Sequence, residues 1–172
     1  METMVSLLEV VEALEIAADE MSSYVNAATG QVITVTHEDL RLAEEDPDAD
    51  MPDWQRDTVA EARRVLESKE WLELPSKFDI HEWDIMSGFG QSLSTASERG
   101  QVEDAIHGSG AFRNFKSTIR RLGIEEAWFA HRKRALETIA REWLTEHGLQ
   151  IGAAQPAVAD GRDPRLRSDP RR

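Results

Sequence analysis

Apolar residues recur at helical spacing along most of the chain. Ser6 and Glu9 form a capping-box pattern, and an apolar stripe then continues to Leu14, which predicts a first helix. Another helix is predicted to begin near Asp79, and Gly148 is a typical stop signal for the last one. The same period predicts further helices over about 38–45, 54–68, 98–107, 111–122 and 124–147.

Two short runs rich in β-forming residues interrupt this helical pattern near the start of the chain. Residues 23–26 and 31–35 flank a turn that contains Gly30, which is typical of a β-hairpin. Residues 71–74 alternate and are stopped by Pro75, which indicates a third short strand beside the hairpin. The predicted fold class is therefore α+β and mostly helical: an N-terminal helix plus β-hairpin packed with a C-terminal multi-helix unit.

The length of 172 residues fits one domain. We place it at residues 1–150, within which sub-lobes 1–75 and 76–150 can be distinguished. Residues 151–172 are almost devoid of apolar side chains and rich in Asp, Arg, Pro and Gly, which predicts a disordered charged tail.

Large aromatic side chains at helical positions indicate where the core lies. Trp54, Ala62, Val65 and Leu66 share one face of the helix over 54–68, which is expected to face the core. We expect the main core to contain Trp83, Phe112, Phe115, Trp128 and Trp143.

The net charge of -13 is unevenly distributed. Residues 1–60 contain fifteen acidic side chains and two arginines, a local charge of -13, whereas residues 61–172 are balanced. Residues 112–134 contain seven basic and two acidic side chains, a local charge of +5. A net acidic chain disfavours nucleic-acid binding, because phosphates are repelled unless a basic surface is segregated.

A basic stripe follows Gly108-Ser109-Gly110 on the helix over 111–122. Arg113, Lys116 and Arg120 recur at i, i+3 and i+7, and Ser109 with Gly110 would stand at the helix start. Three interpretations remain open. The stripe is an ordinary solvated face with Ser109 as the N-cap, a surface that docks against the acidic N-terminal part within or between chains, or a phosphate or nucleic-acid contact.

Arg132 lies in the middle of the apolar stripe of the last predicted helix. An unpaired buried charge is strongly disfavoured, so the guanidinium must reach solvent or meet a partner. It is either a core arginine bonded to an acid or to carbonyl groups elsewhere in the fold, or an anion clamp that lines a pocket.

Catalytic and cofactor motifs are absent from the sequence. There is no cysteine, no HExxH, no Gly-x-Ser-x-Gly and no glycine-rich nucleotide loop. Asp46, Asp48 and Asp50 alternate as at the start of a calcium loop, but the glycine and the final glutamate of that loop are missing. We therefore predict no catalytic residue, no metal site and no cofactor. No leader or membrane-spanning segment is recognisable, which favours a cytoplasmic location.

Several segments in order resemble the bacterial uncharacterised protein family 0158 (UPF0158). These are Leu74–Met86, Gly110–Lys116, Trp128-Phe129 with Arg132, and Ala140–Leu144, preceded by the helix and hairpin with Tyr24 and Thr29-Gly30. The resemblance covers roughly residues 5–150 and leaves out the tail. Because the family has no established activity, the resemblance implies a single domain and transfers no site residue.

The leading functional prediction is a non-enzymatic protein-interaction or regulatory module, whose partner we expect to be another protein. A homodimer through the acidic and basic segments is favoured, and no membrane contact is expected. One alternative is nucleic-acid or phosphate binding through residues 112–134. Another is a small-ligand enzyme with a pocket near His81, Trp83, Trp128 and Arg132.

Overall fold

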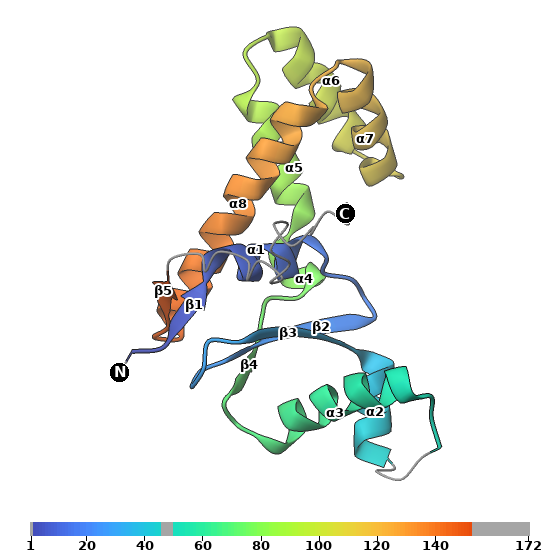
Figure 1. The fold of residues 1–172 in the computed structure, drawn as a ribbon. Coiled ribbons are helices and arrows are strands. Elements are labelled where there is room, and N and C mark those ends of the chain that lie inside the picture. The colour runs from blue at the N-terminus through green and yellow to red at the C-terminus, as the bar shows by residue number, and fades with distance from the viewer. Residues whose placement is uncertain (1, 46–49, 153–172) are drawn as a thin grey trace, which may run out of the picture.

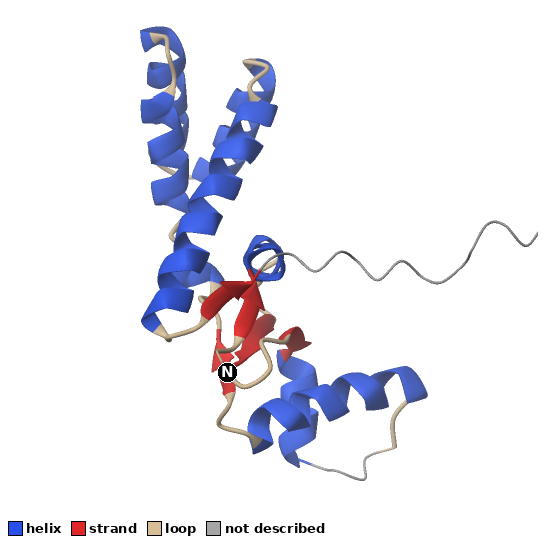
Figure 2. Cartoon of the chain, turned by 60° about the vertical axis from the view of Figure 1, so that its left-hand side comes forward, coloured by secondary structure: helices blue, strands red, loops and turns tan. Residues whose placement is uncertain are grey.

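A computed structural model describes residues 2–45 and 50–152 of the chain. It has the predicted mostly helical α+β fold. Figure 1 shows a small sheet, β2-β3-β4, between helix α1 on one side and helices α2 and α3 on the other. The long helix α8 leads from the end of the described chain toward helices α5, α6 and α7. In Figure 2 the strands gather in the middle, with helices above and below them.

The predicted hairpin is present, and the predicted third strand pairs with it. Strands β2 (Met21–Asn26), β3 (Val32–Thr36) and β4 (Trp71–Glu73) form an antiparallel sheet in the order β3-β2-β4. At the turn, the Asn26 side chain accepts hydrogen bonds from the backbone of Ala28 and Thr29, at 2.9 and 3.0 Å. Gly30 has φ 78°, and an added Cβ would lie 2.1 Å from the Met4 carbonyl oxygen. Only glycine fits there.

The two faces of this sheet pack against different helices. Val25, Val32 and Leu72 point toward the main core, with α1 (Leu7–Glu15). Ile33 and Val35 point the opposite way and pack with α2 (His37–Glu45) and α3 (Asp53–Glu67). This division follows from the two-residue repeat of a strand, which sends alternate side chains to opposite faces. The sheet therefore joins a small second core to the main one.

Two side chains of α3 are not where the helical period predicts. Burial on this helix is confined to Val59, Ala62 and Val65. Trp54 is 70% exposed and Leu66 is 44% exposed, so their prediction as core residues was wrong. Trp54 lies in the first turn of the helix, before the part that the sheet covers.

The helices that follow α4 form the upper part of the molecule in Figure 1. They are α5 (Glu82–Ser92), α6 (Ala96–Ile106), α7 (Ala111–Arg121) and α8 (Glu125–Glu146), close to the predicted ranges. Phe89, Phe115 and Trp128 meet at their centre, with ring centroids 4.7 to 6.2 Å apart. Edge-to-face aromatic pairs at this distance contribute more than the area they bury.

The helix expected to begin near Asp79 is preceded by a separate short turn. Ser76 caps α4 (Lys77–Ile80): its hydroxyl accepts from the Asp79 amide at 3.3 Å, and the Asp79 carboxylate accepts from the Ser76 amide at 2.9 Å. The Ser76 hydroxyl also donates to this carboxylate at 2.8 Å, and the bonds from the Ser76 amide and hydroxyl hold the pKa of Asp79 below its ordinary value. His81 then adopts a left-handed φ of 54°, which ends α4 before α5 begins.

The two ends of the described chain pair with each other. Strand β1 (Met4–Ser6) runs parallel to β5 (Gln150–Gly152). Ser6 also caps α1, as predicted, by accepting from the Glu9 amide at 3.3 Å. The tail was predicted to start at residue 151, but residues 151 and 152 belong to β5; the rest of the predicted tail lies outside the described residues. The main core includes side chains from Val5 to Leu149.

Gly90 allows α5 and α6 to approach closely, which generates a stability prediction. An added Cβ would lie 2.9 Å from Cγ1 of Val102, a stiff and fully buried side chain. Gly90→Ala should therefore lower the free energy of unfolding by about 1–3 kcal/mol, even though alanine favours a helix by about 1 kcal/mol.

Gly100→Ala on α6 is the matched control, because nothing lies within 4 Å of its added Cβ. It should leave stability unchanged or raise it by up to about 1 kcal/mol. Urea unfolding followed by circular dichroism measures both variants, and equal effects would contradict close packing at Gly90.

Candidate functional site: a basic helix face and a groove between α5 and α6

The basic stripe predicted on α7 is exposed in the structure. Arg113, Lys116 and Arg120 all lie on the solvent side of this helix, and we call them the basic face. Nε of Arg120 donates to the carboxylate of Glu125 at 3.0 Å, an exposed pair. Within the described residues, Arg113 and Lys116 are in no ion pair. The basic face is thus not covered by the acidic part of the same chain, which excludes internal docking among the described residues.

Phe112 flanks the basic face and is not a core residue. The core side of α7 is taken by Phe115, Thr118 and Ile119, while the Phe112 side chain is 54% exposed. The prediction that Phe112 belongs to the main core was therefore wrong. The exposed ring of Phe112 stands beside Arg113 and Lys116 of the basic face.

The start of α7 differs from the predicted cap. Gly110, with φ 75°, occupies the N-cap position, and no side chain bonds the first turn. Ser109 is not the cap; its carbonyl oxygen accepts from Nδ2 of Asn114 at 3.4 Å. The reason is geometric: the left-handed conformation that brings the chain into α7 falls on Gly110, and glycine adopts it without strain.

Arg132 does not join the basic face but pairs with Glu82. Its Nε lies 3.0 and 3.3 Å from the two carboxylate oxygens, and Nη2 donates to the nearer one. Both side chains are largely buried, with 24% and 20% of their surfaces exposed. This two-pronged ion pair ties α8 to the first turn of α5, so the interpretation as a core arginine bonded to an acid is correct.

His131, next to Arg132, lies among aromatic rings. Its ring centroid is 5.4 Å from that of Phe89 and 6.3 Å from that of Trp128. Loss of solvent around the imidazole, followed by the nearby positive charge of Arg134, lowers the pKa of His131 below its ordinary value. The histidine is thus held in its neutral form more strongly than an exposed one.

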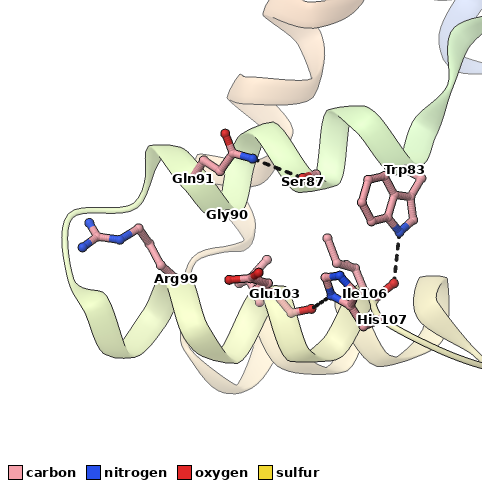
Figure 3. A pocket seen from close by; sticks show the side chains of 9 residues that line it. Trp83, Ser87, Gly90, Gln91, Arg99, Glu103, Ile106 and His107 are labelled. Atoms are coloured by element: carbon pink, nitrogen blue, oxygen red, sulfur yellow. Dashed lines mark hydrogen bonds between the residues drawn. The ribbon is translucent and has the colours of Figure 1, made fainter.

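A groove of about 440 Å³ lies between α5 and α6 (Figure 3). Figure 3 places Trp83 and His107 at one end, Arg99 at the other, and Glu103 between them. The α5 wall consists of Trp83, Ser87, Gly90 and Gln91, and the α6 wall of Arg99, Val102, Glu103, Ile106 and His107. The groove is in the size range of small-molecule sites.

Trp83 contributes to this groove instead of the core. Its side chain is 40% exposed, contrary to the prediction, because its indole N–H donates to the Ile106 carbonyl at 3.0 Å. The His107 ring meets it edge-on, with 6.1 Å between centroids. Of the four residues predicted near a pocket, only Trp83 lines this groove; His81, Trp128 and Arg132 do not. Gly88 and Gly90 in the sequence permit close helix packing, but only Gly90 faces α6 here; an added Cβ on Gly88 would meet His131 of α8.

The structure offers no metal-binding cluster in its described ranges, 2–45 and 50–152. The Asp46–Asp50 loop, predicted to bind no calcium, falls largely on residues 46–49, which lie outside those ranges. Among the described helices, none is both long enough and apolar enough to cross a membrane.

Comparisons with protein-family models, curated proteins and solved structures find no match to this chain. The resemblance to the uncharacterised family 0158 therefore stays a prediction, and function must be inferred from the geometry of the two surfaces.

The Arg132–Glu82 pair gives a testable prediction. Arg132→Met or Glu82→Gln alone should lower the free energy of unfolding by about 1–3 kcal/mol, because each leaves a largely buried charge without its partner. The double variant should lose less than the sum, with a coupling energy of about 0.5–3 kcal/mol.

The exposed Arg120–Glu125 pair is the matched control. The same cycle there, with Arg120→Met and Glu125→Gln, should give a coupling below about 1 kcal/mol. Urea unfolding of all six variants provides the numbers. Equal coupling in the two cycles would show that burial of Arg132 and Glu82 has no energetic effect.

His131 predicts a loss of stability in mild acid. Its folded pKa is lowered, so below the ordinary histidine pKa of about 6.5 the unfolded chain binds a proton that the folded chain does not. Stability from this site is complete above that pH and is lost as pH falls toward the folded pKa. His131→Phe should flatten this part of the curve of unfolding free energy against pH, measured by urea titration. An unchanged slope would rule out His131 as its source.

Proposed function

We propose that this protein is a protein-interaction module that associates with a second copy of itself through the basic face of α7. The single observation that carries the proposal is the exposure of Phe112 beside Arg113 and Lys116, neither of which has an ionic partner in the described part of its own chain. An exposed aromatic ring beside free cations is suited to an acidic surface that also carries an apolar residue.

Helix α1 carries such a surface. Glu9, Glu12 and Glu15 are exposed on it and are in no ion pair among the described residues; we call them the acidic face. Leu8, which precedes Glu9, is 48% exposed.

The two faces share a spacing. Leu8-Glu9-x-x-Glu12 on α1 has the same pattern as Phe112-Arg113-x-x-Lys116 on α7, with acids in place of bases. Two helices with these faces can bring opposite charges together along one contact and bury an apolar side chain at its end.

Energetics favour a weak contact. Exposed ion pairs contribute only about 0.2–1 kcal/mol each, so burial of Phe112 and Leu8 must supply much of the attraction. The net charge of -13 opposes association, but at physiological ionic strength charges farther apart than about 8 Å are largely screened. Pairs in direct contact are screened less, which makes the association specific to these two faces.

The test uses charge reversal on one face at a time. In sedimentation velocity at physiological salt, the wild-type chain should show an average mass that rises with concentration. Arg113→Glu with Lys116→Glu should weaken self-association by about tenfold or more, because both helix faces then carry negative charge. Glu9→Lys with Glu12→Lys should do the same, because both faces are then positive.

A mixture of the two double variants makes the test decisive. Each α7 face then meets a complementary α1 face on the other protein, so the equimolar mixture should associate although neither variant does alone. Arg64→Glu with Lys69→Glu, exposed bases outside both faces, should behave as wild type. A wild-type chain that stays monomeric, or a mixture that does not associate, would overturn the proposal.

Phosphate or nucleic-acid binding by the same residues is the competing function, because Phe112 places an aromatic ring beside the bases. A labelled single-stranded oligonucleotide that binds the monomeric wild-type chain at low salt, and not the Arg113→Glu, Lys116→Glu variant, would favour it over self-association.

A further inference from the structure

Apart from its arginine, the groove between α5 and α6 is lined by more free hydrogen-bond acceptors than free donors. Donors on Trp83, Gln91 and His107 are occupied within the protein (Figure 3), which leaves the Ser87 hydroxyl and one N–H of Gln91. Nε1 of Trp83 donates to the Ile106 carbonyl at 3.0 Å, and Nε2 of Gln91 donates to the Ser87 hydroxyl at 3.4 Å. Each of these bonds joins two groove residues, so these donors are not directed at a ligand.

The ring N–H of His107 is also bonded within the protein. Its Nδ1 lies 2.6 Å from the Glu103 carbonyl oxygen, and since a carbonyl can only accept, Nδ1 carries the proton in this bond. In the neutral imidazole, Nε2 is then a hydrogen-bond acceptor. The bond fixes the ring beside Trp83, so this acceptor has a defined place at one end of the groove.

The acceptors in the groove have no such partners. The Glu103 carboxylate is exposed and, in the part of the chain that the structure describes, makes neither an ion pair nor a side-chain hydrogen bond. One N–H of the Gln91 amide is directed to Ser87, and its Oε1 has no hydrogen-bond partner among the described residues and can accept. A ligand that matches this lining must bring donors and positive charge.

Trp83 favours the same ligand. An indole face attracts a cation within about 6 Å of its centroid more strongly than the other aromatic rings do. Trp83 is partly exposed at the end of the groove where His107 lies, with Glu103 one helical turn before His107 on α6. The exposed part of the Trp83 ring is also the apolar surface that a short hydrocarbon chain can reach, because Val102 and Ile106 behind it are buried.

Arg99 is the one cation in the lining, and it is engaged elsewhere. Its Nη1 donates to the Leu93 and Ser94 carbonyls at 2.8 and 3.3 Å, where it holds the link between α5 and α6. Along the axis of α6, Arg99 stands about 12 Å from His107 at 1.5 Å per residue, so its charge does not face the Trp83 end.

We infer that this groove binds an alkylammonium group, held by the Glu103 carboxylate, Nε2 of His107 and the indole of Trp83, with its hydrocarbon chain against the exposed part of the Trp83 ring. The inference does not depend on self-association through α7, because no residue is shared between the two surfaces.

Isothermal titration calorimetry of the full chain tests it with matched probes. n-Hexylammonium should bind and sodium hexanoate, of the same chain length and opposite charge, should not. Nα-acetyl-lysine amide distinguishes the source: binding of both cations indicates that a lysine side chain of a protein can occupy the groove, whereas binding of hexylammonium alone indicates a free amine.

Glu103→Gln keeps the shape of the side chain and removes its charge, and should weaken hexylammonium binding by about tenfold or more. Asp104→Asn, at the next position of α6 and outside the groove, should bind as wild type. Trp83→Leu should also weaken binding. Circular dichroism melts establish that each variant is folded; should Trp83→Leu not fold, the Glu103→Gln and Asp104→Asn pair decides alone.

Absence of hexylammonium binding would overturn the inference. So would equal affinity for hexanoate, or equal affinity of the Glu103→Gln and Asp104→Asn variants. None of these results bears on the sedimentation experiment, so the two proposals fail or survive separately.

Discussion

The larger of the two cores depends on the burial of one side of α8. Near its start, Trp128 packs against the rings of Phe89 and Phe115, and near its end Leu144 belongs to the same core as α1 and the three-stranded sheet. Isolated helices gain little stability in water, so this helix and the elements around it stabilise one another. The bundle and the N-terminal sheet consequently share a core.

The sequence indicated those parts of the fold whose signals are local. Helical periods, the Ser6 cap and the turn with Gly30 depend on neighbouring residues, and the structure contains each of them. Strands β1 and β5 were not predicted, because three residues have no period of their own and acquire their conformation by pairing across almost the whole chain. His81 was missed as well, since a left-handed histidine has no sequence signature.

The surfaces were predictable to different degrees. Charge segregation revealed the basic face, because charged side chains that recur on one side of a helix rarely enter a core. Arg132 on an apolar stripe implied an acidic partner but not which one; Glu82 became its neighbour through the packing of α5 on α8. The groove could not be predicted from α5 alone. Trp83 has the helical spacing of a core residue, and its indole is part of the groove because it bonds to the Ile106 carbonyl on α6, whose position the sequence does not reveal.

The parallel pairing of β1 with β5 also constrains the order in which the chain can fold. During synthesis β1 is made before every helix and strand that separates it from α8 and from its partner strand β5. Until then the edge of β1 has no strand to pair with, and the apolar side of α1 lacks the helix that covers it. The edge of β1 and part of α1 therefore stay exposed in the nascent chain until these partners have been made, and such surfaces are open to chaperones and to aggregation.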